Sequence, residues 1–157
     1  MRRKNDGEKA HASKKKKRLI TSISSVDKQH ELIGSQIVQR NYAEAVTTCE
    51  RLLNYLPQHA PQHADVLAQL GTAQGMLQHF PQSYDAFTQA LTLEPKNAEL
   101  WYNRSMASRF TMRFGQALHD VERAIELNTR SELTEQFEEA LQFSRQLAEK
   151  SHHIART

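Results

Sequence analysis

Apolar residues recur along most of the chain at the three- and four-residue spacing of amphipathic helices. Between residues 61 and 97, one apolar stripe runs from Val66 to Leu77 and a second runs from Tyr84 to Leu91. The pattern recurs between residues 98 and 130, where a turn at 113–116 separates two further stripes. This pattern predicts an all-α chain whose helices come in antiparallel pairs.

The predicted helix pairs repeat with a fixed period, which is typical of a solenoid. Six positions of one second helix are matched in size or polarity 34 residues later: Phe80, Ser83, Phe87, Ala90, Leu93 and Glu94 by Phe114, Ala117, Val121, Ala124, Leu127 and Asn128. A third copy lies 38 residues before the first of these, at Tyr42, Ala45 and Cys49. The four additional residues fall in the duplicated tetrapeptide PQHAPQHA at 57–64, which we expect to lengthen a loop or to extend the next helix.

These positions resemble the tetratricopeptide repeat (TPR) family, whose 34-residue unit places Trp, Leu-Gly, Tyr, Ala, Phe, Ala and Pro at set intervals. The resemblance covers residues 27–130, and the matching residues are Leu32, Ala45, Leu52 and Pro57 in the first copy, Leu70, Gly71, Phe87, Ala90 and Pro95 in the second, and Trp101, Ala117, Val121 and Ala124 in the third. Arg104 and Ser105 replace Leu-Gly in the third copy. In the first copy, Ile33 and Gly34 indicate a helix register or turn length altered by one residue.

The resemblance implies a right-handed α-solenoid of three helix-turn-helix repeats, at about 27–60, 61–97 and 98–130. Residues 131–150 have helical apolar spacing but no Leu-Gly pair, so we expect a C-terminal capping helix that covers the last repeat. Residues 1–26 are predicted to be a basic, disordered arm with a short lead-in, because the first 18 residues have no large apolar side chain after Met1. Residues 151–157 are predicted to be a tail.

Charge is distributed unevenly between the arm and the rest of the chain. Residues 1–18 hold nine basic and two acidic residues, a net charge of +7, whereas residues 19–157 hold 12 basic and 16 acidic residues, a net charge of −4. The run Lys14, Lys15, Lys16, Lys17 and Arg18 could contact nucleic-acid phosphates with little regard to sequence. In a nucleated cell the same run would resemble a nuclear import signal. A solvated arm without a specific partner is the alternative.

The sequence contains no catalytic motif that we can identify: it has no Gly-rich phosphate loop, no G-x-S-x-G elbow and no H-E-x-x-H helix. His59 and His63 are four residues apart, but the intervening Pro61 and the lack of a third ligand nearby favour a loop over a metal site. The single cysteine, Cys49, occupies an apolar repeat position and is predicted to be a core residue. We therefore expect a non-enzyme that uses no cofactor and no metal.

Cellular location is predicted from the same features. One cysteine favours a reducing compartment, and no apolar run approaches the length of about 18 residues that a membrane-spanning helix needs. We expect a cytoplasmic protein without a membrane partner, which would enter the nucleus if the basic run acts as an import signal.

The resemblance implies that the first helix of each repeat lines a concave groove that binds a partner peptide or helix. The residues expected to line it are His30, Gly34, Ala68, Gln69, Thr72, Met76, Tyr102, Asn103, Met106 and Arg109. Tyr102 and Arg109 are the expected anchors, and packing of these side chains against neighbouring helices is the alternative.

One subclass of the family is disfavoured by its own motif. Chaperone-binding members hold an acidic C-terminal tail with a clamp of Lys, Asn, Asn, Lys and Arg, and the corresponding residues here are His30, Gly34, Gln69, Glu99 and Asn103. The sequence thus predicts a non-catalytic protein-interaction module for a partner other than such a tail. The alternatives are a nucleic-acid-associated protein whose repeats recruit a partner, and the N-terminal repeat piece of a longer protein.

Overall fold

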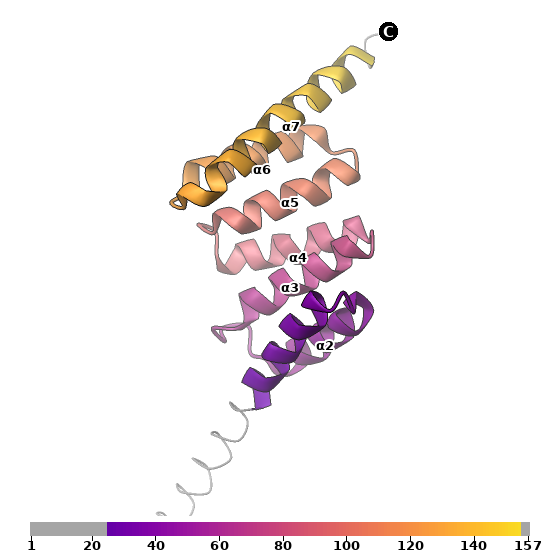
Figure 1. The fold of residues 1–157 in the computed structure, drawn as a ribbon, viewed down its shortest axis with the longest axis vertical. Helices are drawn as coiled ribbons and strands as arrows, with labels where there is room; N and C mark the ends of the chain where they lie inside the picture. The colour runs from indigo at the N-terminus through magenta and orange to yellow at the C-terminus, as the bar shows by residue number, and fades with distance from the viewer. Residues whose placement is uncertain (1–24, 155–157) are drawn as a thin grey trace, which may run out of the picture.

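The computed structural model describes residues 25–154 as a stack of helices along one long axis (Figure 1). A helix over residues 25–38 comes first, followed by α2 (Tyr42–Tyr55), α3 (His63–Met76), α4 (Phe80–Leu93), α5 (Ala98–Phe110), α6 (Phe114–Leu127), the short 3-10 helix η1 (Ser131–Leu133) and α7 (Thr134–Ile154). The predicted all-α solenoid with a C-terminal capping helix is confirmed. None of the described helices has the length and apolar character needed to cross a membrane.

Neighbouring helices in the chain are also neighbours in space. Each of α2 to α6 contacts the helix that follows it, and α3 also contacts α5. The first helices of successive pairs therefore meet along one side of the stack, where the helix at 25–38 touches α3 and α5 touches α7. We call the surface formed by the helix at 25–38, α3, α5 and α7 the first-helix face.

The ends of the described region differ slightly from the predicted boundaries. The first helix already includes residues 25 and 26, which the sequence placed in the lead-in. The capping helix begins at Thr134 after η1 and runs to Ile154, past the predicted end at 150. The predicted basic arm, with Lys14 to Arg18, lies outside the described residues.

The two helices of the α3–α4 pair approach each other most closely at Gly71. A Cβ atom built on Gly71 would lie 2.9 Å from Cζ of Phe87, so the aromatic ring rests directly on the α3 backbone. The Ser83 hydroxyl donates a hydrogen bond of 2.7 Å to the Gly71 carbonyl oxygen at the same crossing. A side chain at position 71 and the ring of Phe87 would therefore compete for one volume in a closely packed interior.

The other two helix pairs carry different residues at the positions that correspond to Gly71 and Phe87. Ser105 and Val121 occupy the equivalent positions in the α5–α6 pair, and both are fully buried. Ile33 and Cys49 occupy them in the first pair, where both belong to one core cluster. The residue on the second helix becomes smaller as the residue on the first helix becomes larger.

The turn inside each pair has one geometry throughout the chain. Arg40, Gln78 and Met112 end the first helices with left-handed φ angles of 62°, 63° and 60°. The amide after each of them donates a hydrogen bond of 2.8 to 2.9 Å to a carbonyl oxygen of the preceding helix: Asn41 to Gln36, His79 to Gln74 and Arg113 to Ser108. These are the bonds of a Schellman-type helix end.

The first copy has the same helix register and turn length as the other two, contrary to the prediction from Ile33 and Gly34. Ile33 precedes Arg40 by the same interval that separates Gly71 from Gln78, so the predicted one-residue change of register or turn length is wrong. Ile33 stands at the glycine position itself, and Cys49 leaves room for it.

The duplicated tetrapeptide lengthens a loop and does not extend a helix. Residues 57–62 form turns in which the Ala60 amide bonds to the Pro57 carbonyl oxygen and the His63 amide bonds to the Ala60 carbonyl oxygen, at 2.9 and 3.0 Å. Ala60 also packs against the core of the first pair. The insertion is therefore absorbed before α3 begins at His63.

Gly71→Ala should lower the free energy of unfolding by about 1–3 kcal/mol, because the added methyl group overpacks the contact with Phe87. Gly34→Ala is a matched control in another first helix, since a Cβ atom at Gly34 meets nothing within 4 Å. The control should be neutral or stabilising by up to about 1 kcal/mol, the usual gain from replacing a helical glycine. Urea unfolding followed by circular dichroism measures both, and equal effects of the two substitutions would contradict the close crossing.

Candidate partner-binding surface

A pocket of about 200 Å³ lies between α3 and α5, two helices of the first-helix face, and residues of α4 also line it. Four of the residues predicted to line the groove, Thr72, Met76, Asn103 and Met106, line this pocket together. The sequence therefore placed side chains from two different helices in one site. Phe80 and Phe110 also line the pocket and were not predicted.

The pocket exists because small residues on α3 face the start of α4. Gly71 and Gly75 lie one turn apart, and Cβ atoms built on them would contact Phe87 and Ser83 respectively. Because these two positions carry no side chain, α3 leaves the space beside Met76 unfilled. At one end, the rings of Phe80 and Phe110 stack with their centroids 4.3 Å apart.

An exposed apolar row runs along the same face at the ends of the first helices. Val38, Met76 and Phe110 are 83%, 57% and 59% exposed, and they are separated by the repeat intervals of 38 and 34 residues. This periodicity is the sequence signal that would have identified Phe110. Apolar side chains gathered at one surface in this way are typical of an interaction site.

A polar cluster lies between the helix at 25–38 and the N-terminal half of α3. The His30 imidazole contacts the Asp65 carboxylate, and Nε2 of Gln69 lies 3.1 Å from Oδ2 of Asp65 and 3.0 Å from Nε2 of His30. His30 and Gln69 were both predicted to face the groove, whereas Asp65 was not. The predicted Ala68 is half-buried and packs against the core of the second pair.

The two expected anchors lie at the α7 end of the face. The Tyr102 ring stacks on the buried Phe137 of α7, with centroids 4.9 Å apart. One face of the Tyr102 ring therefore packs against the capping helix. The guanidinium of Arg109 lies 5.0 Å from the ring centroid of Phe143, also on α7, and its Nη2 donates to the Met106 sulfur. The sequence could not anticipate these contacts because α7 lies outside the repeat.

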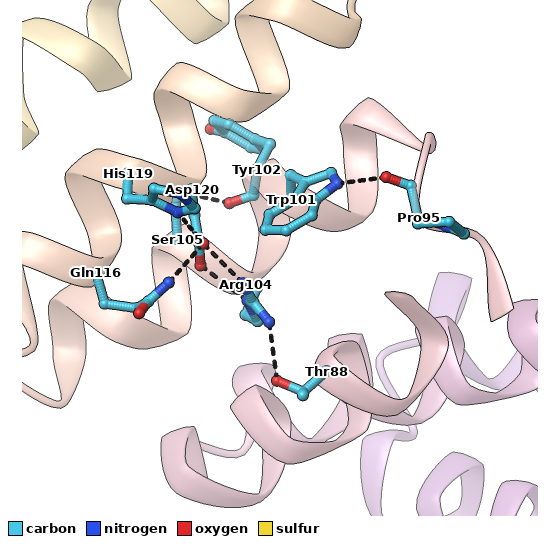
Figure 2. A network of polar contacts seen from close by, with 9 residues as sticks. All are labelled: Thr88, Pro95, Trp101, Tyr102, Arg104, Ser105, Gln116, His119 and Asp120. Carbon is cyan, nitrogen blue, oxygen red and sulfur yellow. Dashed lines mark hydrogen bonds and ion pairs between the residues drawn. The ribbon is translucent and has the colours of Figure 1, made fainter. Parts of the chain in front are cut away.

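Arg104 makes a buried ion pair with Asp120 that links α5 to α6 (Figure 2). Two parallel hydrogen bonds join them, Nε to Oδ2 at 2.9 Å and Nη2 to Oδ1 at 2.8 Å, and the two side chains are 10% and 0% exposed. Nη1 of Arg104 lies 3.3 Å from Oγ1 of Thr88 on α4, which extends the link to the preceding pair.

Aromatic and amide groups complete this network. The Arg104 guanidinium lies 4.7 Å from the Trp101 ring centroid and 5.3 Å from that of Tyr84, and Nε2 of Gln116 donates to Asp120 at 2.8 Å. Burial lowers the pKa of Arg104, but the hydrogen bond and the charge of Asp120 outweigh burial and raise it overall. The guanidinium therefore stays charged despite its burial. The carboxylate on α6 explains why the third copy can carry Arg104 where the family has leucine.

The sequence analysis considered one cysteine and two histidines as candidate reactive groups. Cys49 is fully buried, and burial raises the pKa of its thiol to about 12, so the thiol stays protonated at neutral pH. His59 lies in the loop before α3 and His63 begins α3. Within residues 25–154, no three His, Cys, Asp or Glu side chains are grouped as metal ligands would be.

No protein-family model matches the sequence, and no curated protein matches it. Solved structures of the same architecture do match. The TPR domain of Sgt2 from Aspergillus fumigatus has a TM-score of 0.70 at 17% identity, over 82% of each chain. The translocator chaperone SycD of Yersinia enterocolitica has a TM-score of 0.72 at 12% identity, over 82% of this chain and 87% of that one.

A third structure is the TPR2B domain of yeast Sti1 in a complex with pHsp70, with a TM-score of 0.69 at 13% identity, over 77% of this chain and 96% of that one. The chain therefore has the fold of a TPR domain. At 12–17% identity these matches show the fold that the chain shares with the three proteins.

Asp120→Ala should lower the free energy of unfolding by about 3–5 kcal/mol, because it leaves the Arg104 charge buried without its counter-charge. The double variant Arg104→Leu with Asp120→Ala installs the residues that the preceding pair carries at these positions, Leu70 and Ala86. It should recover most of the loss, since apolar replacement of a buried ion pair is often neutral or stabilising. Chemical denaturation measures both variants, and a double variant no more stable than Asp120→Ala would contradict this account.

Proposed function

We propose that the chain is a non-catalytic module that binds a segment of a partner protein on its first-helix face, in the pocket between α3 and α5. The observation that carries the proposal is the coincidence of this pocket with the exposed side chains of Met76 and Phe110. Apolar side chains left open at one concave site favour a binding surface over a purely structural one.

The size of the pocket favours a protein segment as its ligand. Its volume of about 200 Å³ is below the roughly 300–1,000 Å³ of common small-molecule sites. A space of this size suits one anchoring side chain of a longer segment, with the rest of that segment lying along the helices on either side.

The solved structures support the same class of function. The TPR2B domain of Sti1 is solved in a complex with pHsp70, so a domain of this fold can hold a protein ligand. The clamp positions here carry residues of a different kind, and two of them, His30 and Gln69, lie in the cluster around Asp65. An acidic C-terminal tail held by that clamp is therefore not the ligand that we propose.

The test is affinity capture from native lysate with full-length bait, in which Met76→Lys is compared with Gln89→Lys. Both substitutions add one positive charge at an exposed helical position, but only Met76 lines the pocket, and Gln89 lies on α4, a second helix. A partner bound on the first-helix face should be reduced at least about tenfold by Met76→Lys, because a charge at a desolvated contact weakens binding by more than about 1.4 kcal/mol. It should be retained by Gln89→Lys.

Two further arms separate this function from binding through the basic run. One bait carries Gln in place of Lys14, Lys15, Lys16 and Lys17, and each capture is repeated after nuclease treatment. Capture that survives both changes supports the repeat surface. Capture that requires the lysines and disappears with nuclease would show a nucleic-acid-associated protein and would contradict the proposal.

A further inference from the structure

Arg109 is a half-buried cation at the edge of the pocket. Its guanidinium lies between Met106, which lines the pocket, and Phe143 of α7, which is 49% exposed. A segment that leaves the pocket toward α7 must therefore pass this group. Arg109 is thus within reach of the same ligand that fills the pocket.

No carboxylate among the described residues neutralises this cation. The basic partners of the ion pairs within residues 25–154 are His30, Arg104, His119, Arg123, Arg130 and Arg145, and none of these pairs includes Arg109. The hydrogen bond that its guanidinium makes is to the Met106 sulfur, a weak acceptor. Burial accordingly lowers the pKa of Arg109, in contrast to Arg104, where the Asp120 carboxylate raises it.

Arg109 differs from Arg104 in having no carboxylate partner among the described residues. Arg104 has aromatic rings on its faces and a carboxylate on its edge, whereas Arg109 has an aromatic ring and no carboxylate. A guanidinium presents several N–H donors in a planar fork that matches a carboxylate with two parallel bonds. The missing group is therefore an acidic side chain, which a bound ligand can supply.

We propose that the partner segment carries an internal Asp or Glu that pairs with Arg109, next to an apolar side chain that fills the pocket between α3 and α5. This inference rests on the proposed function and specifies its ligand. It differs from capture of a terminal acidic tail, because Arg109 lies one helical turn or more beyond the clamp positions on α5, Glu99 and Asn103.

The probe is a displayed library of random linear peptides, selected on the full-length wild-type chain. The enriched peptides should combine Asp or Glu with a large apolar residue at a constant spacing. The best peptide is then synthesised with its acidic residue and with Asn or Gln in its place, and both forms are titrated against wild type, Arg109→Gln and Arg123→Gln. Arg123 is a matched control, an exposed arginine on α6 paired with Glu126.

Neutralising the acidic residue should weaken binding to wild type and to Arg123→Gln by about tenfold or more, the usual size of a charge-assisted pair. The same change should alter binding to Arg109→Gln by less than about threefold, since the coupling of the two groups is what the cycle measures. Higher salt should reduce this difference in wild type. The thermal unfolding of each variant is recorded alongside, and if Arg109→Gln does not fold, the peptide change and its salt dependence on wild type decide the result.

Three outcomes would overturn the inference. Enriched peptides without an acidic preference, or an equal loss on wild type and Arg109→Gln, would refute the Arg109 pair while leaving the proposed peptide-binding function intact. Failure of the wild-type chain to enrich any peptide would count against the proposed function itself, and the inference would fall with it.

Discussion

The two helices of each pair cross so closely that their central side chains share one volume, and the rest of the structure depends on this constraint. In the α3–α4 pair the whole volume is given to Phe87, and Gly71 has no side chain. In the first pair, Ile33 and the smaller Cys49 share this volume, and both residues are buried in one cluster. The three turns nevertheless have the same left-handed geometry, so pairs with different central residues join their two helices in the same way.

The polar network around Arg104 adapts the third pair to the same frame. A charged residue replaces a core leucine of the repeat, and it is stabilised by the carboxylate of Asp120 and by the aromatic faces of Trp101 and Tyr84. Buried ion pairs seldom add much stability over apolar packing, so their value here lies in geometry. Arg104 contacts residues of α4, α5 and α6 at once and so links the third pair to the second.

The periodicity of the sequence was sufficient to predict the helix pairs and their order, because these follow from local spacing repeated along the chain. It also brought Met76 and Met106 to one pocket, since both lie on first helices. It was insufficient where partners come from different helices at irregular separation, as with Arg104 and Asp120. The contacts of Tyr102 and Arg109 with α7 were also out of reach, because the capping helix lacks the repeat motif and its rotation cannot be inferred from the repeat.

The central claim is that the first-helix face binds a protein segment, and amide hydrogen exchange of the full chain with and without a saturating selected peptide tests it most directly. Binding in the pocket between α3 and α5 should slow exchange near residues 72–76 and 103–110, and near Phe143 on α7. The second helices α2, α4 and α6 should change little. Protection confined to those second helices would contradict the account, because it would place the ligand on the opposite side of the stack.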